Sequence, residues 1–335
     1  MSPSPADDRR YCRTVLPVVS RTFAINIRLL AGPLGEAVRV GYLLCRAADA
    51  LEDSWPGPAD EMRARFDRLL AAVAGDGAAG ERLARDARAL GGAREDLALV
   101  AELPRVLRVL AALDSEARDA VTLGVRTLAS GMRRYASRAA ERAAGVPYLD
   151  TEAELHDYCY VVAGCVGEML TRLWHGTSPG RDRTLDTRRL AFAPRVGEAL
   201  QLTNILLDWP VDVRRGRCHV PAAWLAETGL EPADLVGSDR PDVHALARRM
   251  EALARAALAE VPAYLALIPG RAVRYRLFCL WPALWAKASL DLATADPEFP
   301  WGPRRPKLPR SRLWSEVAGS VLDPGRPGSL AAPVT

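Results

Sequence analysis

Apolar residues recur every three or four positions along most of the chain, which is the period of an amphipathic α-helix. No segment shows the sustained apolar and polar alternation of a half-buried β-strand. The pattern therefore predicts an all-α protein. The predicted helices span residues 62–73, 81–90, 97–113, 115–144, 151–175, 188–207, 243–267 and 271–292.

Clusters of glycine and proline separate these helices and have the composition of turns. None is long enough to link two independent domains, and no fixed-period repeat is present. We therefore expect a single domain over residues 11–320, with disordered ends at residues 1–10 and 321–335. The Arg- and Pro-rich stretch 297–312 is predicted to be a loop.

Two acidic pairs, Asp49 with Asp53 and Asp208 with Asp212, lie inside apolar stretches about half the chain apart. Side chains four residues apart on a helix share one face, with Cβ atoms about 5–6 Å apart. Like charges at that distance repel, and burying them is costly. Magnesium, which is commonly held by one or two carboxylates with substrate phosphates, would remove both problems. The two pairs therefore predict a site for magnesium and a diphosphate.

Spacing alone is weak support for this prediction. With 41 acidic residues in 335 positions, chance gives about five such pairs, most of them on solvated helix faces. The inference depends on the apolar context. Pro210 lies within the second pair and removes a backbone donor, so we expect that helix to kink or end there. Asn204, four residues before Asp208, is then a third candidate oxygen ligand.

Composition excludes several other classes of protein. The net charge of +4 is small for 45 basic and 41 acidic residues, which argues against a nucleic-acid partner. The six cysteines and four histidines form no cluster at zinc spacing, and the cysteines are expected to be buried thiols in a reducing compartment. No signal peptide is evident, and the most apolar stretch, 275–293, contains four charged or proline positions. We expect a cytoplasmic protein.

A family resemblance rests on five motifs. In chain order they are Pro17-Val-Val-Ser-Arg-Thr-Phe-Ala24, Gly41-Tyr-Leu-Leu-Cys-Arg-Ala-Ala-Asp-Ala-Leu-Glu-Asp53, Asp157-Tyr-Cys-Tyr-Val-Val-Ala-Gly-Cys-Val-Gly167, Leu200-Gln-Leu-Thr-Asn-Ile-Leu-Leu-Asp208 and Arg214-Arg-Gly-Arg-Cys-His-Val-Pro221. Together they resemble the squalene/phytoene synthase family from about residue 11 to about residue 320, and the first two are closer to squalene synthases. The resemblance implies a single-domain helical bundle of the class I isoprenoid synthase type, with a central apolar cavity.

The resemblance also implies roles for particular residues. The implied metal ligands are Asp49, Asp53, Asn204, Asp208 and Asp212. The implied contacts to the substrate diphosphate are Ser20, Arg21, Arg46, Gln201, Asn204 and Arg217. The implied catalytic residues are Tyr42, Tyr158 and Arg46, and the implied pocket residues are Val162, Gly164 and Phe278. In the predicted loop, Lys307 and Arg310 resemble basic residues that engage the phosphate of NADPH in squalene synthases.

The activity implied by the resemblance is a magnesium-dependent prenyl transfer. Two molecules of farnesyl diphosphate would condense head to head through presqualene diphosphate, and NADPH would reduce the product to squalene. A peripheral membrane contact, at the inner face, would serve product release. The alternatives are a non-reducing member that makes a phytoene, dehydrosqualene or hydroxysqualene type of product, prenyl transfer to another acceptor, and a non-catalytic helical interaction protein.

Two positions depart from the family pattern. Leu207 stands where many members have arginine, which removes one potential diphosphate donor. His219 stands where bacterial relatives commonly have tyrosine, which changes the pocket. No dinucleotide-binding G-x-G-x-x-G is present, so the NADPH expectation depends on the resemblance alone.

Overall fold

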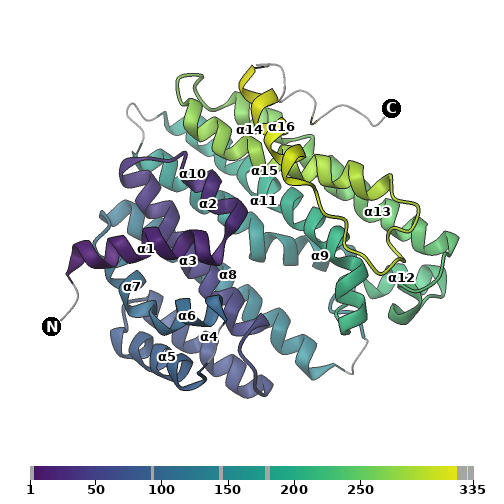
Figure 1. Ribbon diagram of the computed structural model, residues 1–335, viewed down its shortest axis with the longest axis horizontal. Coiled ribbons are helices and arrows are strands. Elements are labelled where there is room, and N and C mark those ends of the chain that lie inside the picture. The colour runs from purple at the N-terminus through teal and green to yellow at the C-terminus, as the bar shows by residue number, and fades with distance from the viewer. Residues whose placement is uncertain (1–3, 92–93, 143–145, 178–181, 323–329, 331–335) are drawn as a thin grey trace. The chain divides into compact units, whose positions relative to one another are not determined.

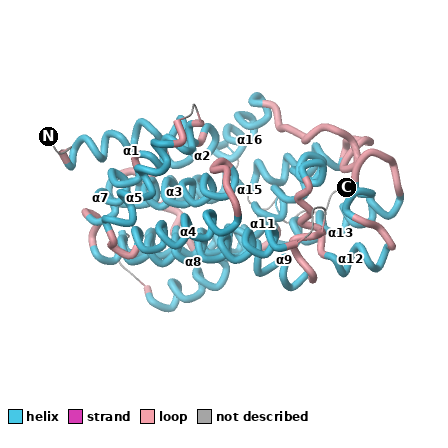
Figure 2. The backbone as a smooth tube through the Cα atoms, turned by 90° about the horizontal axis from the view of Figure 1, so that it is seen from below, coloured by secondary structure: helices cyan, strands magenta, loops and turns pink. Residues whose placement is uncertain are grey.

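The computed structural model describes residues 4–91, 94–142, 146–177, 182–322 and 330. These residues form helices joined by loops, and the described part of the chain contains no strand (Figures 1 and 2). The all-α prediction is therefore confirmed. Contacts within the chain divide it into two compact units: unit 1 comprises residues 1–140 and 168–186, and unit 2 comprises residues 141–167 and 187–335.

Unit 1 is built around the long helix α3. Its helices are α1 (Pro5–Val19), α2 (Arg21–Ile27), α3 (Gly32–Asp53), α4 (Ala59–Val73), α5 (Gly77–Ala89), α6 (Glu95–Ala101), α7 (Leu103–Ala111), α8 (Ser115–Glu141) and most of α10 (Cys165–Thr177). Helices α1, α4, α6 and α7 all pack against α3. Leu43, Leu44 and Leu51 of α3 are consequently fully buried, and this helix forms the core of the unit.

The N-terminus is ordered earlier than expected. Ser4 caps α1 by accepting a hydrogen bond from a backbone N–H in the first turn, and a proline occupies the first helical position. Asp8 is buried and forms ion pairs with Arg105 at 3.0 Å and Arg108 at 2.7 Å. Since α1 begins at residue 5 and is anchored in this way, the expectation of disorder is wrong for residues 5–10.

Prolines break two of the predicted helices. The segment 97–113 forms α6 and α7 because Pro104 lies in the first turn of α7. The segment 243–267 likewise forms α13 (Pro241–Leu258) and α14 (Val261–Ala266), with Pro262 in the first turn of α14. Proline lacks the N–H that a helix interior needs but fits a first turn. Each proline therefore begins a new helix, although the apolar pattern continues across the break.

Unit 2 contains the remaining helices. They are α9 (Glu152–Cys159), a π-helical turn (Tyr160–Gly164), most of α11 (Arg183–Asp212), α12 (Ala222–Thr228), α13, α14, α15 (Val273–Thr294) and α16 (Arg310–Leu322). Helices α13, α14 and α16 pack against α15. Among the described residues no helix has the length and apolar character needed to cross a membrane. The predicted disordered tail, residues 321–335, lies outside the described residues except for residues 321, 322 and 330.

Helix α11 continues through Pro210 and ends two residues later, at Asp212. A short 3₁₀ turn, Val213–Arg215, follows, and Gly216 closes it with a positive φ of 78°. Glycine suits this left-handed conformation because it has no Cβ. Asp208 and Asp212 therefore belong to one helix, although Pro210 was expected to end or bend the helix between them.

Glycines bring the π-helical turn and α10 close to α11. A Cβ on Gly167 would lie 2.2 Å from the carbonyl oxygen of Ala193, and a Cβ on Gly197 would lie 2.2 Å from the carbonyl oxygen of Ala163. No larger residue fits between these backbones without displacing one of them. Glycines in this segment therefore permit the close packing of these helices.

Gly197→Ala should therefore destabilise the protein by about 1–3 kcal/mol, the usual cost of overpacking. Urea unfolding followed by circular dichroism measures this change. Gly77→Ala is the control, because a Cβ at Gly77 has nothing within 4 Å, and it should change stability by less than about 0.5 kcal/mol. Equal effects of the two substitutions would contradict the close approach.

Candidate functional site

A polar stripe runs along one side of the otherwise buried helix α3. Tyr42, Arg46, Asp49 and Asp53 keep part of their surface accessible, whereas most residues between them are buried. Their spacing of four, three and four residues places them on one helix face. The structure therefore brings four of the predicted site residues together in unit 1.

The Tyr42 end of the stripe contacts the start of α2. The hydroxyls of Tyr42 and the buried Ser20 form a hydrogen bond, and the rings of Tyr42 and Phe23 have centroids 5.8 Å apart. Burial raises the pKa of Tyr42, and the bond to Ser20 lowers it less. Arg21 is the first residue of α2, and its side chain lies outside the described part of the structure. Tyr42 is thus a protonated hydroxyl in a polar contact.

The protein environment disfavours the ionised form of the Asp49 carboxyl. Arg46 Nη1 lies 3.3 Å from Asp49 Oδ2. Burial nevertheless raises the pKa of Asp49 to about 6; Arg46 opposes this rise, and Asp53 adds to it by like-charge repulsion. The Asp49 side chain keeps 39% of its surface accessible, so it is surrounded by protein yet reachable. Such a carboxylate is suited to bind a cation from solution.

Asp53 borders a hollow of about 570 Å³ at the C-terminal end of α3. Ser54, Trp55 and Arg94 also line this hollow. Asp53 is the last residue of its helix, where the helix dipole disfavours negative charge. A cation beside Asp53 would be favoured both by the carboxylate and by the end of the helix.

Helix α11 carries the second polar stripe. Gln201, Asn204, Asp208 and Asp212 are accessible to different degrees, whereas Leu202, Thr203, Leu206, Leu207 and Trp209 are buried. Asp212 ends α11 as Asp53 ends α3, so a second acidic pair lies against a helix C-terminus. The predicted residues of this motif thus share one helix face in unit 2.

Arg305 contacts the second pair and was not predicted. Its Nε lies 2.6 Å from Asp208 Oδ1. Burial raises the pKa of Asp208 to about 6 even though Arg305 lowers it, and Asp212 adds to the rise. Leu207 is buried and has no donor group. It therefore does not replace the arginine that the family pattern has at this position. The only sequence signal for Arg305 is its place in the basic stretch 297–312.

Tyr158 and His219 lie together. Tyr158 is on α9, and its ring centroid is 5.3 Å from that of His219. His219 also contacts Tyr148: their ring centroids are 5.2 Å apart, and the rings are nearly perpendicular. The departure at position 219 therefore places an imidazole against a predicted catalytic tyrosine.

Arg217 is half-buried, and its backbone N–H donates to the carbonyl of Asp212 at 2.8 Å.

The remaining predicted residues are dispersed within unit 2. Val162 and Gly164 belong to the π-helical turn, a local feature often found at functional sites. Phe278 is buried on α15 and stacks on Tyr275, with centroids 6.0 Å apart. Lys307 lies in the loop before α16, Arg310 begins that helix, and both are exposed.

Magnesium fits these residues by chemistry. No group of three or more His, Cys, Asp or Glu side chains close enough to hold a metal occurs among the described residues. Each stripe instead offers two carboxylates, and the second adds two amide side chains. Magnesium is usually held in this way, by one or two carboxylates with waters and substrate phosphates.

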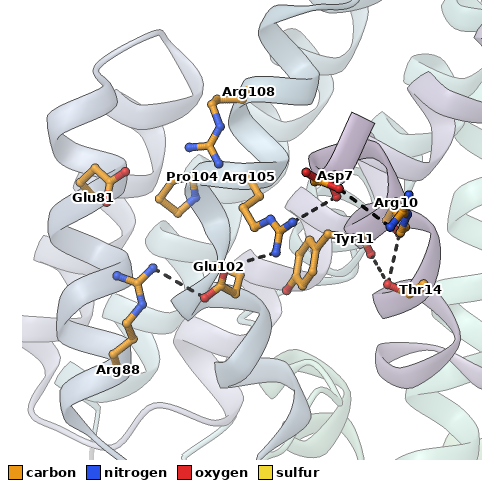
Figure 3. Close-up of a pocket in the computed structure, with 10 residues that line it drawn as sticks. All are labelled: Asp7, Arg10, Tyr11, Thr14, Glu81, Arg88, Glu102, Pro104, Arg105 and Arg108. Carbon is orange, nitrogen blue, oxygen red and sulfur yellow. Dashed lines mark hydrogen bonds and ion pairs between the residues drawn. The ribbon is translucent and has the colours of Figure 1, made fainter. Parts of the chain in front are cut away.

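A separate charged pocket of about 600 Å³ lies between α1, α5 and α7 (Figure 3). Arg105 lies over the ring of Tyr11 at 4.7 Å and donates to the backbone of Asp7, and Arg88 pairs with Glu102 at 3.8 Å. The pocket contains none of the predicted site residues. Since no residue of the five motifs lines this pocket, the polar stripes are the better candidate site.

The chain is similar in sequence to known proteins over most of its length. The sequence model of the squalene/phytoene synthase family matches residues 16–312. The chain is 28% identical to a squalene synthase of Botryococcus braunii over 215 residues, covering 62% of this chain and 41% of that one. It is 40% identical to the phytoene synthase of Thermus thermophilus over 109 residues, covering 32% and 35%. The chain spans less than half the length of the squalene synthases that it matches first.

A solved structure shares the fold. The complex of TcSQS with the ligand BPH1237 superposes with a TM-score of 0.76 at 22% identity, covering 97% of this chain and 89% of that one. This likeness supports the helical fold implied by the five motifs.

The loop between α15 and α16 is tied to the end of α11. Arg214 donates to the carbonyl of Pro210, to Gly302 at 2.7 Å and to Trp301 at 2.9 Å. Arg214→Ala should therefore speed amide hydrogen exchange in residues 300–306 by about tenfold or more, because each lost hydrogen bond stabilises the closed loop by about 1 kcal/mol. Arg215→Ala, at an exposed neighbour, is the control. Unchanged exchange in the Arg214 variant would contradict this anchoring.

Proposed function

The chain belongs to the squalene/phytoene synthase family, whose members are prenyltransferases, and we propose that it condenses two molecules of farnesyl diphosphate head to head. Presqualene diphosphate is the proposed intermediate and squalene the proposed product. The observation that supports this proposal best is the pair of polar stripes on α3 and α11. Each presents two carboxylates on one helix face, and burial raises the pKa of one carboxyl in each, Asp49 and Asp208, to about 6.

The stripes suit the first chemical step, which is loss of diphosphate from an allylic carbon. Bound magnesium would neutralise the negative charge that develops on the leaving group. Asp49 with Asp53 on one stripe, and Asp208 with Asp212 on the other, would each hold magnesium through ionised oxygens. Raised pKa values fit this role because an uncompensated carboxylate gains most from a cation.

Basic and polar side chains would complete the diphosphate site. Arg46 suits a phosphate because its planar guanidinium donates two parallel hydrogen bonds. Its Nε is buried and has no hydrogen-bond partner among the described residues, so the group has unused donor capacity. We extend the proposal to the motif residues Ser20, Arg21, Gln201, Asn204 and Arg217, and to Arg305 on the loop. Arg305 would supply the donor that Leu207 lacks.

Tyrosines would manage the proton that leaves when the cyclopropane ring forms. Tyr42, protonated and bonded to Ser20, and Tyr158, beside His219, are the proposed groups. Each phenol oxygen would accept this proton as its own proton passes to a nearby acceptor, the released diphosphate for Tyr42 and the imidazole of His219 for Tyr158. The imidazole of His219 gives Tyr158 a neighbour that can accept or donate a proton, which a tyrosine at that position does less readily. Val162, Gly164 and Phe278 would line the proposed apolar cavity for the prenyl chains, which must exclude water from the cation.

The second half-reaction would be reduction by NADPH, with Lys307 and Arg310 at its phosphate. Both side chains are exposed, Lys307 on the loop whose Arg305 contacts Asp208 and Arg310 at the start of α16. A cofactor phosphate could therefore reach both. Because squalene is a hydrocarbon, the proposal includes a peripheral membrane contact for its release. A non-reducing activity is the second candidate, and it is favoured by the 40% identity to a phytoene synthase over 109 residues.

Loss of one carboxylate from either stripe should abolish most activity. Asp49→Asn and Asp208→Asn should each lower magnesium-dependent pyrophosphate release from farnesyl diphosphate by at least about a hundredfold, because removing one stabiliser of developing charge commonly costs 10²–10³ in rate. Asp212→Asn should be comparably severe, since α11 continues through Pro210.

The matched control for these variants is Asp119→Asn, which removes an exposed carboxylate of α8. It should keep wild-type activity, and all four variants should keep the helical circular dichroism. Near wild-type pyrophosphate release from Asp49→Asn or Asp208→Asn would refute the metal assignment.

Product analysis with and without NADPH separates the two candidate functions. A reducing enzyme should form squalene only with NADPH and accumulate presqualene diphosphate without it. Lys307→Ala with Arg310→Ala should then raise the KM for NADPH about tenfold or more, because each charge-assisted hydrogen bond contributes about 1.5–3 kcal/mol. Arg304→Ala, at an exposed neighbour, is the control. The same products with and without NADPH would rule out reduction.

A further inference from the structure

A buried carboxylate outside the five motifs lies beside the first polar stripe. Asp96 is the second residue of α6, and only 9% of its surface is exposed. Its Oδ1 accepts a hydrogen bond from the backbone N–H of Leu97 at 3.0 Å, and Arg94 Nε lies 3.8 Å from the same oxygen. Burying a carboxylate this deeply is unfavourable unless specific partners compensate for it.

The other oxygen of Asp96 contacts α3 at two points. Arg46 Nη2 lies 3.7 Å from Asp96 Oδ2, and the hydroxyl of Ser54 donates a hydrogen bond to the same atom. Ser54 is the residue that caps α3, directly after Asp53. One buried carboxylate therefore joins the guanidinium in the stripe to the end of the helix that carries the acidic pair.

Arg46 is consequently held by two carboxylates. Its Nη1 reaches Asp49 at 3.3 Å, while its Nη2 is directed to Asp96. An arginine side chain has about 2 kcal/mol of rotamer entropy, which a single partner restricts only in part. Two carboxylates on different helices fix the guanidinium more strongly. Asp96 is too buried to contact a ligand readily, so it would act through Arg46 and Ser54.

We propose that Asp96 is a positioning residue for the diphosphate-binding end of α3. It holds the Arg46 guanidinium in place before the substrate arrives and keeps the cap of α3 closed beside Asp53. Arg46 then pays less conformational entropy when a diphosphate binds. This inference rests on the proposed function, because it assigns Asp96 a role only if Arg46 binds a diphosphate.

The test is a double-mutant cycle that uses binding of inorganic pyrophosphate in the presence of Mg²⁺, measured by calorimetry. Asp96→Asn is nearly isosteric and can still accept from Ser54, but it loses the charge that holds Arg46. It should weaken pyrophosphate binding about tenfold, which corresponds to about 1.4 kcal/mol. In an Arg46→Gln background the same substitution should have almost no effect, because the group it positions is gone.

A purely structural role would give a different result. Asp96→Asn would then weaken binding equally in both backgrounds, or change only the melting temperature, and either result would overturn the inference. Glu95→Gln removes an exposed charge from the preceding position of α6 and should leave binding unchanged. The proposed function fails separately, if the wild-type protein neither binds Mg²⁺-pyrophosphate nor releases it from farnesyl diphosphate.

Discussion

The candidate site depends on two pairs of carboxylates, one at the C-terminal end of α3 and one at the C-terminal end of α11. Both acidic pairs lie in the last turns of long helices and beside buried residues, where like-charge repulsion and the helix dipole disfavour ionised carboxylates. Burial, with like-charge repulsion from Asp53 and Asp212, raises the pKa values of Asp49 and Asp208 to about 6. Magnesium, the ion that we propose for this site, would supply positive charge to these carboxylates and to a bound diphosphate.

The surrounding contacts keep these carboxylates accessible while limiting their freedom. Arg46 and Arg305 each reach one acidic pair, but neither restores an ordinary pKa. Asp96 and Ser54 join the end of α3 to α6, and Arg214 joins the end of α11 to the loop that carries Arg305. In both units the polar stripe is therefore supported by residues from other elements, as expected for a site that must be arranged before its ligand binds.

Much of the fold could be predicted from the sequence because helical periodicity depends on local spacing. The all-α class and most helices were found in this way, and the pairing of acids on one face followed from the same spacing. The breaks at Pro104 and Pro262 were missed because the apolar period continues across them. Asp96 and Arg305 were missed for a different reason: both act through contacts between residues 40 to about 100 positions apart, and single-sequence patterns contain no such distances. The early start of α1 likewise depends on Asp8 meeting α7.

A crystal structure with Mn²⁺ and a non-reactive thio analogue of farnesyl diphosphate would test the central claim most directly. Manganese takes the place of magnesium and gives an anomalous signal. We expect anomalous peaks within about 2.2 Å of carboxylate oxygens of Asp49 or Asp53 and of Asp208 or Asp212, with diphosphate oxygens completing the coordination. A diphosphate bound away from both stripes, or peaks at neither acidic pair, would contradict the account.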